Sequence, residues 1–258
     1  MSMDPATLRA RLIAQASEPY RAAGRYAYHF ARGKLSRDPM FIGLLRLGLF
    51  PGDAHILDLG CGQGLLAAWL LSARRLYDAG DWPEGWPTPP RVADIHGVDH
   101  SRSDVTRAQL AVEGPVRFEQ GDMRLVDFGR ANVVVMLDAV HYVDGASQDD
   151  VLRRVRAALA PNGLFLIRVG DADAGLGFQL SNWIDRAVAF CRGYGRGRLH
   201  CRSVPNWLRV LEALGFRVET APMNGNLPFA NVMLIARLGE ADGSTSGSAQ
   251  LRTADSTS

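Results

Sequence analysis

The first fifty residues carry apolar side chains at steps of three and four positions, which is the spacing of an amphipathic helix. A proline and a glycine interrupt this pattern, so it predicts two short helices in place of one long helix. A third helix is expected over residues 39–47, with Asp38 as its N-cap and Pro39 in its first position. Residues 1–50 are therefore expected to form a helical segment ahead of the main domain.

From residue 54 onward, short β-rich runs alternate with amphipathic helical stretches, which predicts parallel βαβ units. The expected strands are 54–59, 94–99, 116–120, 131–137, 163–169, 216–221 and 229–237. The expected helices are 64–77, 101–112, 147–160, 178–192 and 205–214. The run 131–137 is apolar on both of its faces except at Asn132, as expected for a central strand that is covered on both sides. The predicted fold class is α/β.

Two segments are expected to lie outside this regular structure. Residues 78–91 contain four prolines, which remove hydrogen-bond donors and predict an inserted loop at the amino edge of the sheet. Trp82 and Trp86 of this loop are therefore expected to lie away from a ligand site at the carboxyl edge. Residues 240–258 are rich in Gly, Ser, Thr and Ala and are expected to be disordered, which leaves 51–239 as the main domain.

A glycine-rich segment, Asp-Leu-Gly-Cys-Gly-Gln-Gly at residues 58–64, joins the first strand to the next helix. Glycines lack a Cβ, so the backbone can turn sharply and a ligand can lie against the main chain. A dinucleotide-binding loop needs a small residue where this chain has Leu65, which disfavours a nicotinamide-dependent oxidoreductase. A P-loop is excluded because no Gly-Lys-Ser/Thr follows. The pattern that remains is D-x-G-x-G-x-G.

This motif resembles that of class I methyltransferases, which use S-adenosylmethionine (SAM), and the resemblance covers roughly residues 53–238. It implies a Rossmann-like three-layer sandwich with a mostly parallel seven-stranded sheet, an antiparallel last strand and an N-terminal helical lid over residues 1–50. It also implies a cofactor site for SAM. The implied cofactor-binding residues are Asp58, Gly60, Cys61, Gly62, Gly64, Asp99, His100, Asp122, Met123, Asp138 and Arg32.

The resemblance also implies roles for some of these residues. Asp99 should accept hydrogen bonds from both ribose hydroxyls, although a role as N-cap of the next helix is open to it and equally to Ser101. Asp122 should bond the adenine amino group and Met123 should lie against the base, although a Gly-Asp pair also forms ordinary turns. Arg32 could pair with the SAM carboxylate, and a solvated basic helix face explains it too.

The acceptor side is expected at the end of the fourth strand. His141 is the candidate general base because a neutral imidazole suits neutral pH, and Tyr142 could stack on or orient an acceptor. A loop histidine that only forms hydrogen bonds is an equally good interpretation of His141. Enzymes that methylate exocyclic base nitrogens carry an Asn/Asp-Pro-Pro-aromatic element here, which this chain lacks. Near the fifth strand, Asn162 is expected to adopt a left-handed conformation.

Composition narrows the function classes further. The net charge of +2 is too small to indicate a nucleic-acid partner by itself, and no apolar run approaches the length of a membrane span. The N-terminus does not have the pattern of a secretory signal, so a cytoplasmic protein with reduced thiols is expected. Cys191, His200 and Cys201 supply only three ligands, so no metal site is expected.

The leading hypothesis is therefore a SAM-dependent methyltransferase that transfers a methyl group to a small-molecule acceptor by in-line displacement, with O- or N-methylation favoured. The arginine-rich segment 191–203 leaves two alternatives open, a carrier protein or RNA as the substrate, with nucleic acid less favoured. A flexible basic loop with no partner is the simplest explanation of that segment. A non-catalytic SAM-binding module is the third hypothesis.

Overall fold

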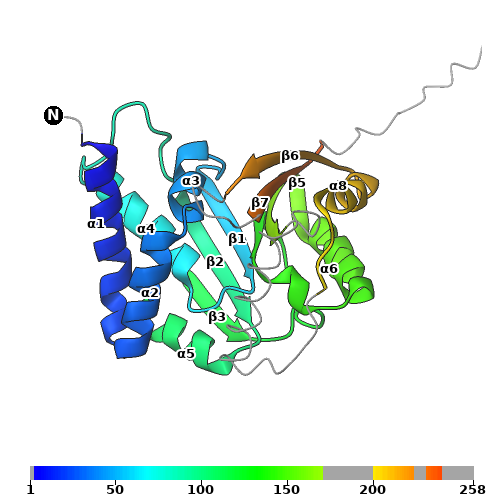
Figure 1. Cartoon of the computed structure of the whole chain (residues 1–258), viewed down its shortest axis with the longest axis horizontal. Coiled ribbons are helices and arrows are strands. Elements are labelled where there is room, and N and C mark those ends of the chain that lie inside the picture. The colour runs from blue at the N-terminus through cyan, green and yellow to red at the C-terminus, as the bar shows by residue number, and fades with distance from the viewer. Residues whose placement is uncertain (1–2, 171–199, 224–230, 240–258) are drawn as a thin grey trace, which may run out of the picture.

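The computed structural model describes residues 3–170, 200–223 and 231–239, and the described strands form one sheet in the order β3-β2-β1-β4-β5-β7-β6 (Figure 1). The strands are β1 (Asp53–Leu59), β2 (Arg91–Asp99), β3 (Val116–Gln120), β4 (Ala131–Leu137), β5 (Leu159–Gly170), β6 (Phe216–Pro222) and β7 (Asn231–Leu238). β7 pairs antiparallel with both β5 and β6, whereas the pairs formed among β1 to β5 are all parallel. The predicted seven-stranded sheet with an antiparallel last strand is confirmed.

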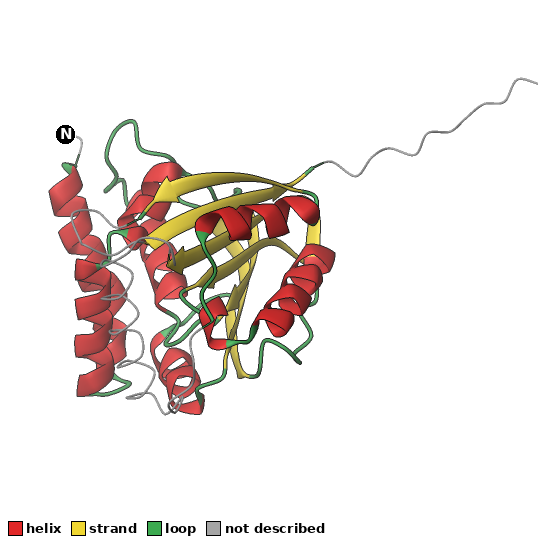
Figure 2. Ribbon diagram, turned by 45° about the vertical axis from the view of Figure 1, so that its right-hand side comes forward, coloured by secondary structure: helices red, strands yellow, loops and turns green. Residues whose placement is uncertain are grey.

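Helices cover both faces of this sheet (Figure 2). The helices are α1 (Pro5–Ser17), α2 (Arg25–Arg37), α3 (Met40–Leu47), α4 (Leu65–Asp78), α5 (Arg102–Ala111), α6 (Gly145–Ala158) and α8 (Val204–Ala213), with 3-10 turns η1 (Glu18–Arg21) and η2 (Val140–Tyr142). In β4, Val133 and Val135 pack with α1 to α5, whereas Val134 and Met136 pack with α6 and α8. The apolar character of both faces of β4 therefore reflects a three-layer core.

The N-terminal helices share the core of the sheet. Leu8 and Leu12 of α1 are fully buried in the same hydrophobic cluster as Trp69 of α4. The Tyr20 hydroxyl donates a hydrogen bond of 2.7 Å to the carbonyl of Gln63, inside the glycine-rich segment. The first fifty residues are therefore packed directly against the part of the chain that carries the predicted site.

Most element boundaries differ from the predictions by one to four residues, and the start of the third helix is a case in which a tertiary contact is involved. Helix α3 begins at Met40, one residue later than expected. The Asp38 carboxylate still accepts the Met40 N–H at 3.0 Å, but it also pairs with Arg168 of β5. Asp38 is thus fixed by a tertiary contact as well as by its hydrogen bond to the start of α3. Separately, Asn162 adopts the expected left-handed conformation, with a φ of 59°.

The proline-rich loop lies at the amino end of the sheet, as predicted. Trp82 Nε1 donates to the Pro87 carbonyl at 3.1 Å, and its ring meets that of Trp86 edge-on. The predicted helix 178–192 and the predicted disordered tail 240–258 lie outside the described residues. Within the described ranges, no helix is both long and apolar enough to cross a membrane.

Candidate active site

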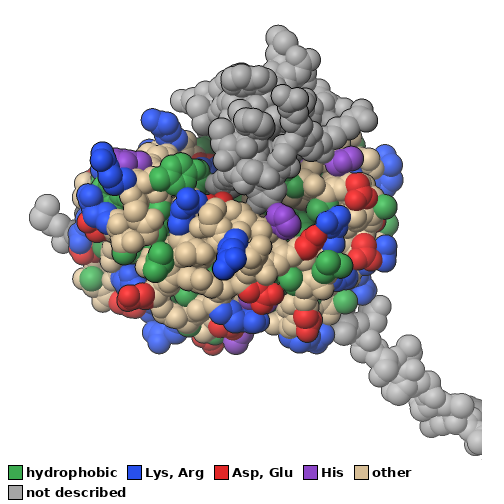
Figure 3. Space-filling view, turned by 90° about the horizontal axis from the view of Figure 1, so that it is seen from below, with side chains coloured by type: hydrophobic (Ala, Val, Ile, Leu, Met, Phe, Trp, Pro, Cys, Tyr) green, Lys and Arg blue, Asp and Glu red, His purple; other side chains and the backbone are tan. Residues whose placement is uncertain are grey.

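A cavity of about 690 Å³ lies at the carboxyl edge of the sheet, between the ends of β1 to β4 and the N-terminal helices. Figure 3 shows the molecule from this edge, where acidic, basic and histidine side chains are mixed. Among the predicted cofactor residues, the cavity is lined by Asp58, Gly60, Cys61, Gly62, Asp99, His100, Asp122, Met123 and Asp138. The structure therefore brings most of the predicted site together.

The glycine-rich segment forms a tight turn after β1. The Cys61 N–H donates to the carbonyl of Val98, which ties the turn to β2. At Gly64, with a φ of +73°, an added Cβ would come within 2.7 Å of the Phe118 ring, so this glycine serves packing and does not line the cavity. At Gly62, with a φ of +54°, an added Cβ would meet nothing within 4 Å. The main chain at Gly62 is therefore open toward the cavity.

Asp99 lies directly beside this turn. Its side chain is buried, one carboxylate oxygen accepts the Gly62 N–H at 2.8 Å, and the other accepts the Ser101 N–H at 2.8 Å. The N-cap of α5 is Ser101, whose hydroxyl accepts the Asp104 N–H at 3.3 Å. The helix cap is thus assigned to Ser101, and Asp99 is placed on the cavity wall.

The two titratable side chains of the turn, Asp58 and Cys61, are both held in their neutral forms more strongly than usual. Burial, with a smaller contribution from the neighbouring charge of Asp99, raises the pKa of Asp58 to about 7. Burial also raises the pKa of the Cys61 thiol well above its usual range, with Asp58 and Asp99 adding to the effect. Both effects favour the neutral thiol of Cys61 over the thiolate that a nucleophilic role requires.

Asp122 follows β3 and pairs with a neighbour that the sequence did not indicate. Its two oxygens accept from Arg124 Nε and Nη2 at 3.0 and 2.6 Å, and Arg124 also lines the cavity. These hydrogen bonds hold the pKa of Asp122 below its usual range. Met123 lies beside this pair on the cavity wall. Asp122 is thus an ionised acceptor whose position is fixed by Arg124.

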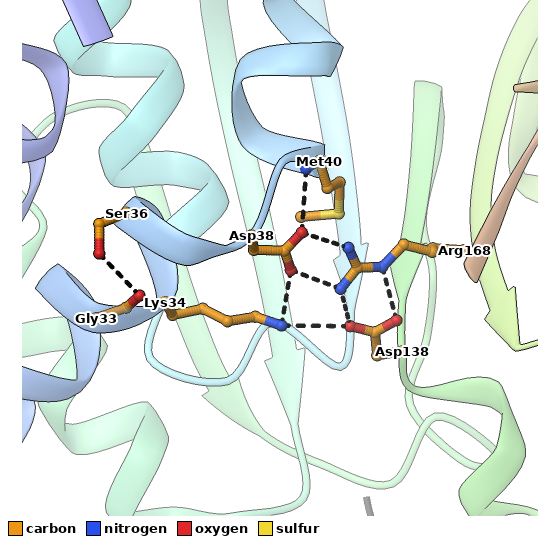
Figure 4. Close-up of polar contacts among 7 residues, drawn as sticks. All are labelled: Gly33, Lys34, Ser36, Asp38, Met40, Asp138 and Arg168. Atoms are coloured by element: carbon orange, nitrogen blue, oxygen red, sulfur yellow. Dashed lines mark hydrogen bonds and ion pairs between the residues drawn. The ribbon is translucent and has the colours of Figure 1, made fainter. Parts of the chain in front are cut away.

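Asp138 belongs to a cluster of four charged side chains that join β4, β5 and the N-terminal helices (Figure 4). Arg168, which is 2% exposed, donates from Nε to Asp138 at 2.7 Å and from both Nη atoms to Asp38 at 2.7 and 2.8 Å. A further contact joins Arg168 Nη2 to Asp138. Lys34 Nζ lies 2.8 Å from Asp38 and 3.6 Å from Asp138.

The charges of this cluster stabilise one another. Burial opposes ionisation of Asp138, but Arg168 and Lys34 outweigh burial and hold its pKa far below the usual range. The sequence signal for Arg168 is a single charged residue inside the otherwise apolar run 163–169. A charged residue in such a run is expected to pair with a buried group of opposite charge. The sequence pattern does not indicate which acidic residues form that pair.

The comparison with protein families decides the identity of the domain. Residues 28–221 match the family model described as the methyltransferase domain, which is more than half of the chain. The chain belongs to the methyltransferase-domain family. The sequence resemblance, which rested on the glycine motif and the strand-end acids, is therefore confirmed.

Curated relatives match this chain over part of their length. Carboxy-S-adenosyl-L-methionine synthase of Aliivibrio fischeri is 30% identical over 131 residues, which are 49% of this chain and 48% of that protein. The enzyme of the same name from Chromohalobacter salexigens is 32% identical over 119 residues, which are 44% and 39% of the two chains. This chain thus spans about half of the relatives' length or less.

Solved structures of methyltransferases share the fold. An O-methyltransferase family protein of Burkholderia thailandensis has a TM-score of 0.59 at 20% identity, covering 86% of this chain and 63% of its own. Human N-acetylserotonin methyltransferase, solved with SAM, has a TM-score of 0.57 at 19% identity, and the match covers 85% of this chain and 57% of that protein. Magnesium protoporphyrin IX methyltransferase of Synechocystis, solved with S-adenosylhomocysteine (SAH), has a TM-score of 0.55 at 17% identity. That match covers 92% of this chain and 100% of the Synechocystis protein.

Besides Gly64, two predicted site residues of the methyltransferase domain do not line the cavity. Arg32 is exposed and is not among the described residues that line the cavity, where Lys34 of the same helix takes its place. His141 is buried and is also absent from the described lining, whereas Tyr142 is part of it. The two rings lie 4.4 Å apart, so His141 contacts Tyr142 from behind the cavity wall.

His141 is a neutral side chain in this domain. Burial lowers its pKa, Asp138 opposes that shift and Arg168 adds to it. Its Nε2 atom has no hydrogen-bond partner within the described part of the chain. Because His141 is buried behind the described lining of the cavity, its position does not test the general-base role, which stays a prediction.

The arginine-rich segment is described only from His200 onward. Arg202 donates to the Gly145 carbonyl at 2.8 Å and pairs with Asp149 at 2.7 Å, so it holds this segment against α6. His200 lines the cavity. No group of His, Cys, Asp and Glu among the described residues is arranged to hold a metal ion.

Proposed function

We propose that this methyltransferase-domain chain binds SAM in the cavity and transfers its methyl group to the oxygen or nitrogen of a small organic acceptor. The observation that carries the proposal is the buried Asp99 carboxylate hydrogen-bonded to Gly62, beside main chain that no Cβ covers. A flat ligand can lie against such backbone while its hydroxyls reach the carboxylate. The residues of this chain therefore fit an adenosine-containing ligand.

The charge of the cavity supports a cationic ligand. The described residues that line the cavity include five aspartates, one lysine and one arginine. The aspartates are Asp58, Asp99, Asp122, Asp138 and Asp144, and the cations are Lys34 and Arg124. When bound, SAM supplies a methyl group already activated on a sulfonium, so that transfer is an in-line displacement. Even without Asp58, whose pKa is raised to about 7, four aspartates face two cations, and this excess favours a ligand that carries the positive charge.

Each polar residue has a distinct binding role in the proposal. Asp99 accepts hydrogen bonds from the ribose hydroxyls, and Asp122, held by Arg124, accepts from the adenine amino group beside Met123. Lys34 replaces Arg32 as the cation of the N-terminal helices that pairs with the SAM carboxylate, because only Lys34 lines the cavity. The N-terminal helices would thereby act as the predicted lid.

The acceptor is expected beside the apolar part of the wall. Phe30, Met40, Phe41 and Leu137 line the cavity there, and a volume of about 690 Å³ lies within the range of about 300–1,000 Å³ that is typical of small-molecule sites. Tyr142 lies on the same wall and would orient the acceptor. Asp138 is a poor base because its pKa is so low. Holding the acceptor in line and excluding water would then supply most of the rate enhancement.

A second candidate is the formation of carboxy-SAM, which the names of the matching relatives favour. The two candidates differ in their nucleoside product. Methyl transfer leaves SAH, whereas the second candidate leaves carboxy-SAM and requires a carboxylic acid that gives up its carboxyl group to the methyl carbon of SAM, with loss of a proton from that carbon. Mass spectrometry of the nucleoside fraction after incubation with SAM and a panel of phenols, amines and carboxylic acids separates the two, and RNA and carrier proteins in the same panel test the macromolecular alternatives.

Calorimetry tests the cofactor site directly. The wild-type chain is expected to bind SAM and SAH but not NADH. The substitution Asp99→Ala should weaken SAM binding by about 1.5–3 kcal/mol, the range for losing hydrogen bonds to a charged group. Binding of NADH without SAM would overturn the proposed function, and unchanged SAM affinity in the variant would overturn the assignment of Asp99 to the ribose.

A further inference from the structure

Arg168 joins two walls of the cavity that are far apart in the sequence. Asp38 lies between α2 and α3, 130 residues before Arg168, and Asp138 lies at the end of β4. One edge of the guanidinium, Nε and Nη2, donates to Asp138, and another edge, Nη1 and Nη2, donates to Asp38, as Figure 4 shows. Arg168 itself is not among the described residues that line the cavity. It therefore acts on the site only through the residues that it holds.

The residues next to the two aspartates form the cavity wall. On the helical side, Lys34, Met40 and Phe41 line the cavity, and they flank Asp38 on both sides. On the sheet side, Leu137 and Asp138 line it. A shift of Asp38 relative to Asp138 would therefore change the distance between the two walls.

Asp138 is also held in an unusual backbone conformation. Its φ of 56° lies in the left-handed region, which an aspartate adopts only at a cost. Two hydrogen bonds from Arg168 fix its carboxylate, so the guanidinium helps to hold this turn in place. The end of β4 and the junction of α2 with α3 are thus held by the same side chain.

Stability alone is a poor explanation for this cluster. A buried arginine loses its hydration, and apolar residues of similar volume commonly replace buried ion pairs with little loss or some gain of stability. An arginine does supply a rigid planar fork that bonds two carboxylates in fixed directions, which a lysine cannot do. The advantage of Arg168 over an apolar residue is therefore geometric.

We propose that Arg168 is a positioning residue that sets the separation of the two cavity walls by holding Asp38 against Asp138. The junction of α2 and α3 has a second anchor, because Trp69 Nε1 of α4 donates to the Phe41 carbonyl at 2.8 Å. Loss of the Arg168 bridge should therefore release residues 34–41 locally and leave the helices packed. The ligand-binding part of this inference rests on the proposed function, and the structural part does not.

The test uses a variant that removes one positive and one negative charge together. Arg168→Met alone leaves two aspartates facing each other and risks misfolding, so Asp38→Asn is combined with it, and Lys34 stays beside Asp138. Arg168→Lys keeps the charge but lacks the fork. Arg153→Met is the matched control, since Arg153 pairs with Asp150 on the exposed face of α6.

Three measurements are made on each variant of the whole 258-residue chain: the free energy of unfolding in urea, the affinity for SAH, and amide hydrogen exchange. The double variant should unfold at nearly the wild-type free energy, yet bind SAH about tenfold more weakly. Its exchange over residues 34–41 should quicken about tenfold while residues 65–78 of α4 keep the wild-type rate. Arg168→Lys should change binding and local exchange in the same direction, and Arg153→Met should change neither.

Two results would overturn the proposal. One is a double variant with wild-type SAH affinity and wild-type exchange over residues 34–41. The other is faster exchange in α4 by the same factor as in the junction, which would show a general loss of stability. Should the wild-type chain fail to bind SAH, the proposed function would be wrong, and the exchange data would still decide whether Arg168 positions the junction.

Discussion

The buried carboxyl of Asp58 should contribute stability at low pH that is lost as the pH rises. Asp58 is 3% exposed, and its pKa is about 7 against an ordinary 3.8. Between these values the folded chain keeps a proton that the unfolded chain releases, so folding weakens with increasing pH. The difference of about three pKa units corresponds to about 4 kcal/mol, all of it lost above pH 7.

The substitution Asp58→Asn removes this titration and keeps the size of the side chain. The free energy of unfolding of the variant, minus that of the wild type, should therefore rise by about 4 kcal/mol between about pH 4 and about pH 8. Urea unfolding at a series of pH values measures this difference. A constant offset from the amide does not matter, because only the change with pH carries the argument.

Asp53→Asn is the matched control, since Asp53 is exposed at the start of the same strand. This variant removes the same charge from the same strand but from an exposed position, so it controls for the loss of a carboxylate as such. Curves for Asp58→Asn and the wild type that run parallel from about pH 4 to about pH 8 would refute the reasoning. Burial and the charge of Asp99 would then not be raising the pKa of Asp58.

Further predictions concern the cofactor site. Gly62→Ala should cost about 1 kcal/mol of stability, from backbone strain alone, and weaken SAH binding about tenfold in calorimetry. Gly64→Ala should cost about 3 kcal/mol in urea unfolding, because its Cβ would also meet the Phe118 ring; equal costs at both glycines would contradict this difference. SAM affinity should rise with pH through about 7 as Asp58 ionises, and a pH-independent affinity would exclude that linkage.

Local patterns were enough to predict the elements and the glycine turn. Helices and strands follow from periodicities within about ten residues, and the turn at residues 58–64 follows from contiguous glycines. Asp99 and Asp122 could be placed because the carboxyl ends of neighbouring parallel strands meet at one edge of the sheet. These inferences need only the chain order and the strand topology.

The rotation of a helix and the direction of a loop side chain depended on tertiary packing. Lys34 lies two positions after Arg32, about 200° further around α2, and the apolar pattern did not decide which of them faces the cavity. Likewise, His141 and Tyr142 are adjacent in a 3-10 turn, and packing buries the first and turns the second toward the cavity.

The sequence by itself determined the α/β class, the strand-turn-helix at residues 53–78 and the acids at the strand ends, because each is set by neighbours in the chain. Only the tertiary structure decided that Arg168 joins Asp38 to Asp138. A pairing across 130 residues leaves no local periodicity, since it depends on where two separate parts of the chain meet in space. The same reason explains why the walls of the cavity could not be assigned before the fold was known.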